Sequence, residues 1–138
     1  MRNIYKVYML SSLLAGVMLC GACSDEKELT GKWKLERYET SAGDVCEVDS
    51  AFFNFMKGTF SMICVCPDDE YVTFFGNYVL HDDVLDINLR SGDVEKYGGL
   101  FRKYLDWDGC SRSFQVEELS RRDLQLAHGD SVLYMRKY

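Results

Sequence analysis

The chain has 138 residues and a formal net charge of −6, with 16 basic against 22 acidic side chains. Phosphate backbones and anionic lipid surfaces repel an acidic chain, so we expect no nucleic-acid partner. Aromatic residues make up 14% of the sequence and proline occurs once, a composition that excludes intrinsic disorder. The length suits one domain.

Residues 1–22 have the organisation of an export signal. Arg2 and Lys6 give the segment a basic start, and an apolar run follows over residues 7–18. The small residues Gly21-Ala22 end it. Because the apolar run is shorter than the roughly 20 residues that a spanning helix needs, we interpret the segment as a cleaved signal peptide.

Cys23 directly follows Gly21-Ala22 and resembles the cysteine of the bacterial lipobox, which is acylated and becomes the mature N-terminus. Cys20 is the rival site, but it follows the bulky Leu19, which fits a cleavage site poorly. A lipobox cysteine carries three acyl chains, and two or more chains hold a protein stably on a membrane. Removal of the leader takes away two basic residues, which changes the net charge to −8.

Residues 24–28 read Ser-Asp-Glu-Lys-Glu and resemble the acidic export signal of surface lipoproteins in Bacteroidetes-type bacteria. The resemblance implies a location on the outer face of the outer membrane, with the lipid anchor as the contact to the membrane. We interpret residues 23–29 as a solvated tether and residues 30–138 as one folded domain.

The mature chain begins with a predicted strand over residues 33–38, in which Trp33, Leu35 and Arg37 alternate with polar neighbours. A turn is expected over residues 41–44. After it, Asp49 or Ser50 can cap a short helix over Ala51 to Lys57, which Gly58 would end.

Three further predicted strands follow, and the hairpin formed by the last two is the clearest feature. Thr59 to Cys66 forms one strand, which Pro67 ends. Tyr71 to Leu80 and Val84 to Arg90 are expected to pair as the hairpin. Gly76 lies inside the longer strand, where glycine commonly marks a bulge or a sharp bend.

The last third of the chain contains an irregular segment and three strands. Residues 91–112 are rich in both glycine and aromatic residues, so we expect a covering segment. The strands are predicted over Phe114 to Leu119, Leu124 to Ala127 and Val132 to Lys137, separated by polar turns. Open edges on so many strands invite aggregation, so the sequence predicts an all-β fold, an antiparallel up-and-down barrel of about eight strands with a short helix after the first strand.

The motif Leu29-x-Gly31-x-Trp33 at the first strand is similar to the Gly-x-Trp signature of lipocalins. Residues 75–80, 114–126 and 134–137 also resemble the small lipocalin-like lipoproteins of Bacteroidetes-type bacteria, a calycin-like barrel family. The resemblance implies a lipocalin-like barrel. It also implies that Trp33 packs at the barrel base under a basic side chain of the last strand, which is Arg136.

Four cysteines remain after lipidation, namely Cys46, Cys64, Cys66 and Cys110. Export permits disulfides, and four cysteines allow three connectivities, between which the sequence does not choose. Neighbours two apart on a strand share a face, so Cys64 and Cys66 are expected to pair with the other two cysteines rather than with each other. A zinc site with a histidine is the alternative, although Cys-x-Cys spacing is weak evidence for one, and we expect no metal.

The sequence contains few residues suited to catalysis. Its two histidines, His81 and His128, both lie in predicted turns beside acids, where solvated surface is the usual role. Asp106-x-Asp108-Gly109 begins like a calcium loop but lacks the later oxygen ligands. No nucleophile elbow, zincin helix or phosphate-binding glycine loop occurs, so we expect neither an enzyme nor a cofactor.

Two functions fit an anchored barrel without catalytic groups. In the first, the barrel interior binds a small hydrophobic or amphipathic ligand. The candidate lining residues are Phe60, Met62, Phe74, Tyr78, Leu85, Ile87, Phe114, Val116, Leu126 and Tyr134. In the second, the barrel is solid and its outer face or loops dock another envelope protein or a glycan.

Overall fold

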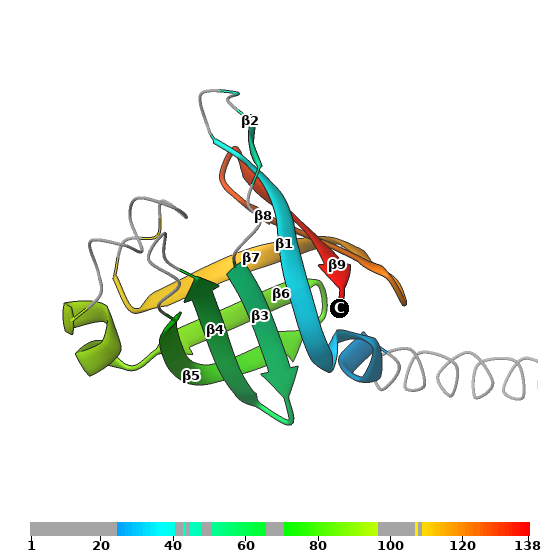
Figure 1. Ribbon diagram of the computed structural model, residues 1–138. Coiled ribbons are helices and arrows are strands. Elements are labelled where there is room, and N and C mark those ends of the chain that lie inside the picture. The colour runs from blue at the N-terminus through cyan, green and yellow to red at the C-terminus, as the bar shows by residue number, and fades with distance from the viewer. Residues whose placement is uncertain are drawn as a thin grey trace, which may run out of the picture.

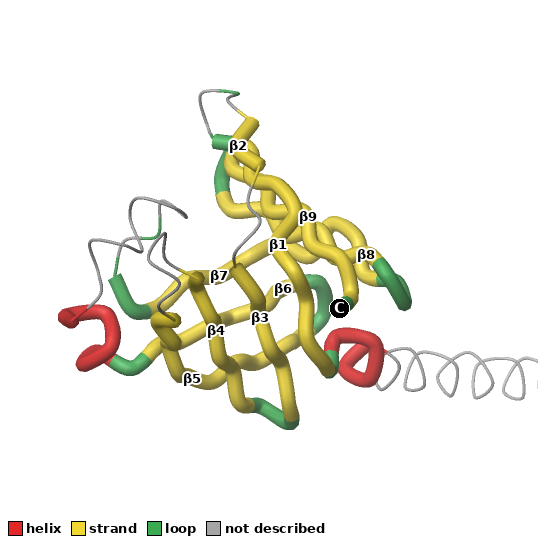
Figure 2. Tube along the Cα trace, in the orientation of Figure 1, coloured by secondary structure: helices red, strands yellow, loops and turns green. Residues whose placement is uncertain are grey.

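The structure is a computed structural model of the chain and describes residues 25–40, 43, 45–47, 51–65, 71–96, 107 and 109–138. These residues contain β1 (Gly31–Glu39), β2 (Val45–Glu47), β3 (Ala51–Met56), β4 (Thr59–Val65), β5 (Tyr71–His81), β6 (Val84–Leu89), β7 (Ser111–Leu119), β8 (Asp123–His128) and β9 (Ser131–Lys137). Two short helices, over residues 25–29 and 91–96, lie on opposite sides of the barrel (Figure 2).

Eight of the described strands close into an antiparallel barrel (Figure 1). Each of β3 to β8 pairs with the next strand along the chain, β9 pairs back onto β1, and β1 pairs with β3. The short strand β2 pairs with the distal part of β1, beyond the residues that pair with β3. The predicted barrel of about eight strands is therefore confirmed.

The barrel interior is filled by large aromatic and aliphatic side chains. Phe53 packs edge to face on Phe60, with ring centroids 5.4 Å apart, and Phe55 packs in the same way on Tyr78, at 5.1 Å. At another point in the core, Trp107 packs on Phe114 with centroids 5.5 Å apart. Such offset contacts add to the stabilisation that comes from burying the ring surfaces.

The helix predicted over Ala51 to Lys57 is wrong, because this segment forms strand β3. Its side chains alternate, so that Ala51, Phe53 and Phe55 are buried. The strand pairs with β1 on one side and β4 on the other. Lys57 and Gly58 both have positive φ, 45° and 84°, as a two-residue hairpin turn requires. Pairing on both sides and the β propensity of phenylalanine outweigh the capping signal.

The basal end of the barrel, defined here as the end covered by residues 25–30, is closed by a helical turn rather than left beside a free tether. Leu29 is fully buried, and its carbonyl accepts a hydrogen bond of 2.8 Å from the Trp33 indole nitrogen. The Tyr78 hydroxyl donates to Glu26 at 2.9 Å. Residues 25–29 therefore belong to the folded domain.

The basic side chain at Trp33 is Lys137, so the expectation of Arg136 is wrong. Lys137 Nζ lies 4.4 Å from the Trp33 ring centroid and donates to the carbonyls of Thr30, at 2.5 Å, and Glu28, at 3.1 Å. Side chains alternate along a strand, and Arg136 takes an outward position. Gly31 has φ 129°, and a Cβ there would lie 2.8 Å from Lys137 Nζ, which explains the glycine of the motif.

Gly76 marks a close approach of two strands rather than a bulge. The register of β5 runs without a shift through Gly76 to both of its neighbours. A Cβ at this position would lie 2.1 Å from the carbonyl oxygen of Asn88 in β6. The register shifts of the barrel lie in β1, between Leu35 and Arg37, and in β7, between Val116 and Glu118.

No helix among the described residues is long and apolar enough to cross a membrane.

Gly76→Ala is expected to lower the free energy of unfolding by about 1–3 kcal/mol, because a backbone oxygen must move to admit the methyl group. Gly92→Ala is the matched control, since a Cβ there meets nothing within 4 Å and the residue lies in the helix over residues 91–96. Urea unfolding curves of both variants measure the difference. Equal midpoints for the two variants would contradict this account of Gly76.

Candidate functional site

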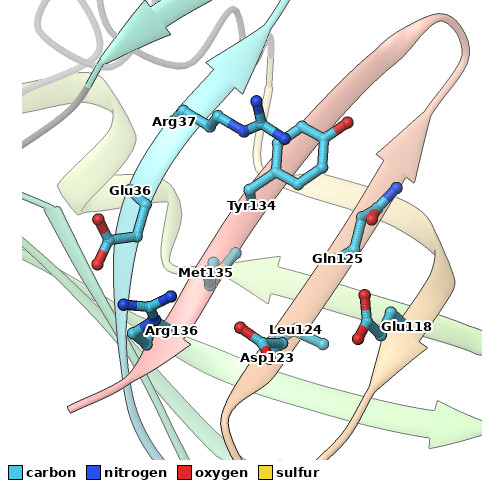
Figure 3. Close-up of a pocket in the computed structure, with 9 residues that line it drawn as sticks. All are labelled: Glu36, Arg37, Glu118, Asp123, Leu124, Gln125, Tyr134, Met135 and Arg136. Atoms are coloured by element: carbon cyan, nitrogen blue, oxygen red, sulfur yellow. The ribbon is translucent and has the colours of Figure 1, made fainter.

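An open groove runs over the outer wall of the barrel, across β1, β9, β8 and β7 (Figure 3). Its volume is about 310 Å³. The lining residues are Glu36, Arg37, Glu118, Asp123, Leu124, Gln125, Tyr134, Met135 and Arg136. Leu124 and Met135 are buried side chains that point into the barrel, so most of the exposed lining is polar.

Strand register explains why these polar side chains lie together. Arg37 pairs with Tyr134, Tyr134 with Gln125, and Gln125 with Glu118, which makes one row across four strands. Residues opposite each other in antiparallel strands have Cβ atoms about 5 Å apart, so their side chains interact. Arg136 pairs with Asp123 in a second row.

The two bulges form the walls of the groove. A bulge puts one extra residue into a strand and re-aims the side chains around it. In β1 the shift leaves both Glu36 and Arg37 exposed, and in β7 it leaves both Glu117 and Glu118 exposed. The β1 edge of the groove thus carries two adjacent charged residues, whereas on the β7 side Glu118 lines the groove and Glu117 does not.

Within the groove, Tyr134 is held by contacts at its face and its hydroxyl. The Arg37 guanidinium carbon lies 3.8 Å from the Tyr134 ring centroid. The Tyr134 hydroxyl donates to Glu39 at 3.4 Å. Figure 3 shows Arg37 lying across the Tyr134 ring, with Glu36 and Arg136 projecting from neighbouring strands. The stack fixes the guanidinium plane and leaves its edge open to a ligand.

The groove combines three carboxylates, two guanidinium groups and one amide. Among the described residues, Glu36, Glu118 and Arg136 form no ion pair. Carboxylates accept and guanidinium groups donate in planar forks, while the Gln125 amide does both. This set suits a ligand that offers many hydrogen-bond donors and acceptors at close spacing.

The candidate lining residues of the interior lie almost entirely in the packed core. Phe60, Met62, Phe74, Tyr78, Leu85, Ile87, Phe114 and Leu126 expose between 0% and 3% of their surface. A side chain that lines a cavity large enough for water retains accessible surface. These eight side chains retain almost none, so they line no such cavity. Val116 is half-buried against the core, and Tyr134 points outward into the groove.

The sequence of the chain matches the model of the lipocalin-like domain over residues 15–138. The chain belongs to the lipocalin-like family. A crystal structure of a lipocalin-like protein from Bacteroides uniformis has 37% sequence identity and a TM-score of 0.73, and the match covers 80% of this chain and 99% of that one.

A crystal structure of an uncharacterized protein from Bacteroides eggerthii is similar at 33% identity and a TM-score of 0.67, with the same coverage of both chains. No match was found among curated proteins. The predicted resemblance to lipocalin-like proteins of Bacteroidetes-type bacteria is confirmed.

In this lipocalin-like barrel, the two histidines lie on exposed surface, one beside the Asp86 carboxylate and the other beside the Ser113 backbone. His81 Nε2 is 2.8 Å from Asp86, and the Ser113 hydroxyl donates to the other oxygen of that carboxylate. His128 Nδ1 lies 3.1 Å from the Ser113 carbonyl oxygen. The serine hydroxyl donates to Asp86, so the imidazole of His81 does not serve as its base, unlike the order of a catalytic triad.

The cysteine prediction falls partly outside the described residues. Cys64 is half-buried and packs against the core, and Cys110 is half-buried with a free thiol. The side chain of Cys46, all of Cys66, and Asp106 and Asp108 of the loop motif lie outside the described part. The disulfides therefore stay a prediction. The described residues contain no group of three potential metal ligands.

Sequence reasoning missed the groove because strict alternation puts Arg37 on the inner face and Tyr38 on the outer face. The bulge reverses this order, and Tyr38 is 4% exposed. An arginine on an otherwise apolar face was the available signal. Adjacent Glu117 and Glu118 gave a similar signal in β7, since two charged neighbours in a half-buried strand indicate a bulge.

Hydrogen bonds from Ser113 and then His81 hold the pKa of Asp86 below its ordinary value. The carboxylate therefore contributes stability above that ordinary pKa, and the contribution is lost as the pH falls through the folded-state pKa. Ser113→Ala is expected to raise the pKa of Asp86 more than His81→Ala does, as carboxyl-detected NMR titration would measure.

Ser111→Ala is the matched control for this titration, because the Ser111 hydroxyl donates to Asn88 instead. An unchanged pKa of Asp86 in Ser113→Ala would show that the hydroxyl does not stabilise the carboxylate.

Proposed function

We propose that this lipocalin-like protein is a lipid-anchored envelope protein whose solid barrel carries a recognition site for a glycan on its outer wall. The observation that carries the proposal is the contrast between the two faces of the sheet. Eight candidate interior residues expose at most 3% of their surface, whereas the outer groove of about 310 Å³ is open and polar.

The chemistry of the groove supports a hydroxyl-rich ligand. Each sugar hydroxyl group can donate and accept hydrogen bonds. It can therefore donate to a carboxylate or an amide oxygen and accept from a guanidinium or an amide nitrogen. The charges nearly balance, with three carboxylates against two guanidinium groups, so neither a polyanion nor a polycation is favoured. Rigid strands rather than loops hold these groups, which limits the entropy lost on binding.

The anchor rests on the N-terminal sequence. The basic start, apolar run and Gly21-Ala22-Cys23 site support acylation of Cys23, and the acidic residues after it support export to the outer face of the outer membrane. Glycans are abundant at such a surface, so location and groove chemistry support the same role. No catalytic set is needed for it.

A second candidate function is binding of an apolar ligand inside the barrel. It is favoured by Trp107, which lies outside the barrel strands and packs on Phe114 in the core. Displacement of the Trp107 indole from the core would make room in the barrel interior. The interior of an eight-stranded barrel is wide enough for one small ligand. This function requires the interior to repack, whereas the outer groove is already formed.

Native mass spectrometry of the protein extracted from membranes distinguishes these candidates. We expect a chain that begins at Cys23 with covalent acyl chains and carries no further lipid. Cys23→Ala should lack the acyl mass and leave the membrane fraction. A lipid that co-purifies in larger amount with Trp107→Ala than with the wild type would favour the interior site. An unmodified Cys23 in the wild type would contradict the anchor.

Binding to an array of neutral and acidic oligosaccharides, followed by calorimetry on the best binder, tests the groove. Arg136→Ala is expected to weaken the affinity about tenfold or more, because it removes charge-assisted hydrogen bonds. Arg136 is exposed and makes no ion pair within the described part of the chain, so the variant should keep its stability.

Arg90→Ala is the control for the groove, because it removes the same charge from a side chain that stacks on Phe75, outside the groove. Equal affinities of the two variants, or an array without any bound oligosaccharide, would contradict the proposed glycan site.

A further inference from the structure

The basal end of the barrel is rigidly joined to the segment that follows the proposed anchor. Residues 25–30 are held by the buried Leu29 side chain, by the bond between Tyr78 and Glu26, and by the two carbonyl contacts of Lys137. Thr30 closes the helical turn with hydrogen bonds from its amide and hydroxyl to the Glu26 carbonyl. The turn therefore moves with the barrel.

Only Ser24 separates Asp25 from Cys23. Two residues of chain span at most about 7 Å even when fully extended. An acyl group on Cys23 must lie in the hydrocarbon of the bilayer, so a link this short leaves no room for a water layer between the barrel and the headgroups. We propose that the basal end is a bilayer-contacting surface that sets the orientation of the barrel, an inference that rests on the proposed lipidation of Cys23.

A basic hollow lies beside the docked turn at this end. Its volume is about 420 Å³, and it is lined by Lys27, Glu28, Thr30, Arg121 and Lys137. Lys27 and Arg121 are exposed and form no ion pair with other described residues. Lys27 and Arg121 can attract the phosphate groups of phospholipid headgroups, which is the usual basis of electrostatic contact with a membrane. The Lys137 ammonium is held by the carbonyls of Glu28 and Thr30 and adds positive charge beside them.

The other side of the docked turn is acidic and limits the contact to one side. A smaller hollow of about 160 Å³ is lined there by Asp25, Asp82, Asp83, Glu117 and Glu118, together with three apolar residues. Carboxylates repel headgroup phosphates within a Debye length. The barrel is therefore expected to meet the bilayer on the side of Lys27 and Arg121, with the β7–β8 turn next to the headgroups.

Hydrogen–deuterium exchange of the acylated full-length protein in vesicles of phosphatidylethanolamine and phosphatidylglycerol tests this orientation. The comparison is a variant with a flexible Gly/Ser insertion of about 12 residues after Ser24, which adds roughly 20 Å of reach. Amides of residues 119–123 are expected to exchange roughly fivefold more slowly in the wild type than in the insertion variant. Residues 91–96, at the other end of β6, should exchange equally in both.

Variants of the basic hollow provide the second comparison. Lys27→Ala with Arg121→Ala should give exchange rates at residues 119–123 between those of the wild type and the insertion variant. Arg90→Ala with Lys96→Ala removes the same charge away from the basal end and should behave as the wild type does.

The outcomes separate this inference from the proposed anchor. Intact mass reports acylation independently of exchange, so an unmodified Cys23 would overturn the anchor and the inference together. Acylated wild type and insertion variant with equal exchange at residues 119–123 would overturn the basal contact alone.

Discussion

The closure of the barrel base depends on Trp33 and the Lys137 ammonium that lies over it. The Trp33 indole N–H group donates to the Leu29 carbonyl, and the Lys137 ammonium donates to two further carbonyls of the same turn. Burial lowers the pKa of Lys137, although the nearby Glu28 carboxylate acts in the opposite direction. The chain tolerates the cost of desolvating this cation because the ring face and the carbonyls replace its water.

The same arrangement explains why the first strand begins where it does. Gly31 has a positive φ that favours glycine, and its missing side chain leaves room for the Lys137 ammonium, which binds the carbonyls of the turn. Once the turn is docked, Leu29 adds apolar surface to the core, and Glu26 accepts a bond from Tyr78. Burial and this hydrogen bond raise the pKa of Tyr78, so the phenol stays protonated as a donor. One end of the sheet is thus sealed by contacts that join the docked turn to β5 and β9.

Much of the barrel could be predicted from sequence because hairpins are local. At the turns that contain Asp82-Asp83 and Arg121-Arg122, the flanking strands end or begin within one or two residues of the predicted positions. The segment at Phe53 was misread because its capping signal is local, whereas the pairing with β1 and β4 that decides its structure is not. Arg136 was preferred to Lys137 because the family resemblance gives a basic residue on the last strand but not its phase.

The groove could not be predicted for a related reason, since it depends on the register of four strands and on two bulges. The row joins Arg37 to Tyr134, Gln125 and Glu118, which are all more than 80 positions away from Arg37 in the chain. A bulge changes which residues face outward without changing composition, so pattern reading assigned Arg37 to the wrong face. Filling the interior with aromatic rings leaves the outer wall as the place where such polar residues can gather.

The basal contacts and the groove are connected through β9, which supplies Lys137 to one and both Arg136 and Tyr134 to the other. Successive residues of a strand point to opposite faces, so the register that places Lys137 inward over Trp33 also places Arg136 outward beside Asp123. A slip of β9 by one residue would break the seal and the groove together. In the proposed orientation on a membrane, the register of β9 therefore determines two features. The Lys137 side chain closes the anchored end of the barrel, and its inward position fixes the outward position of the residues that would contact a ligand.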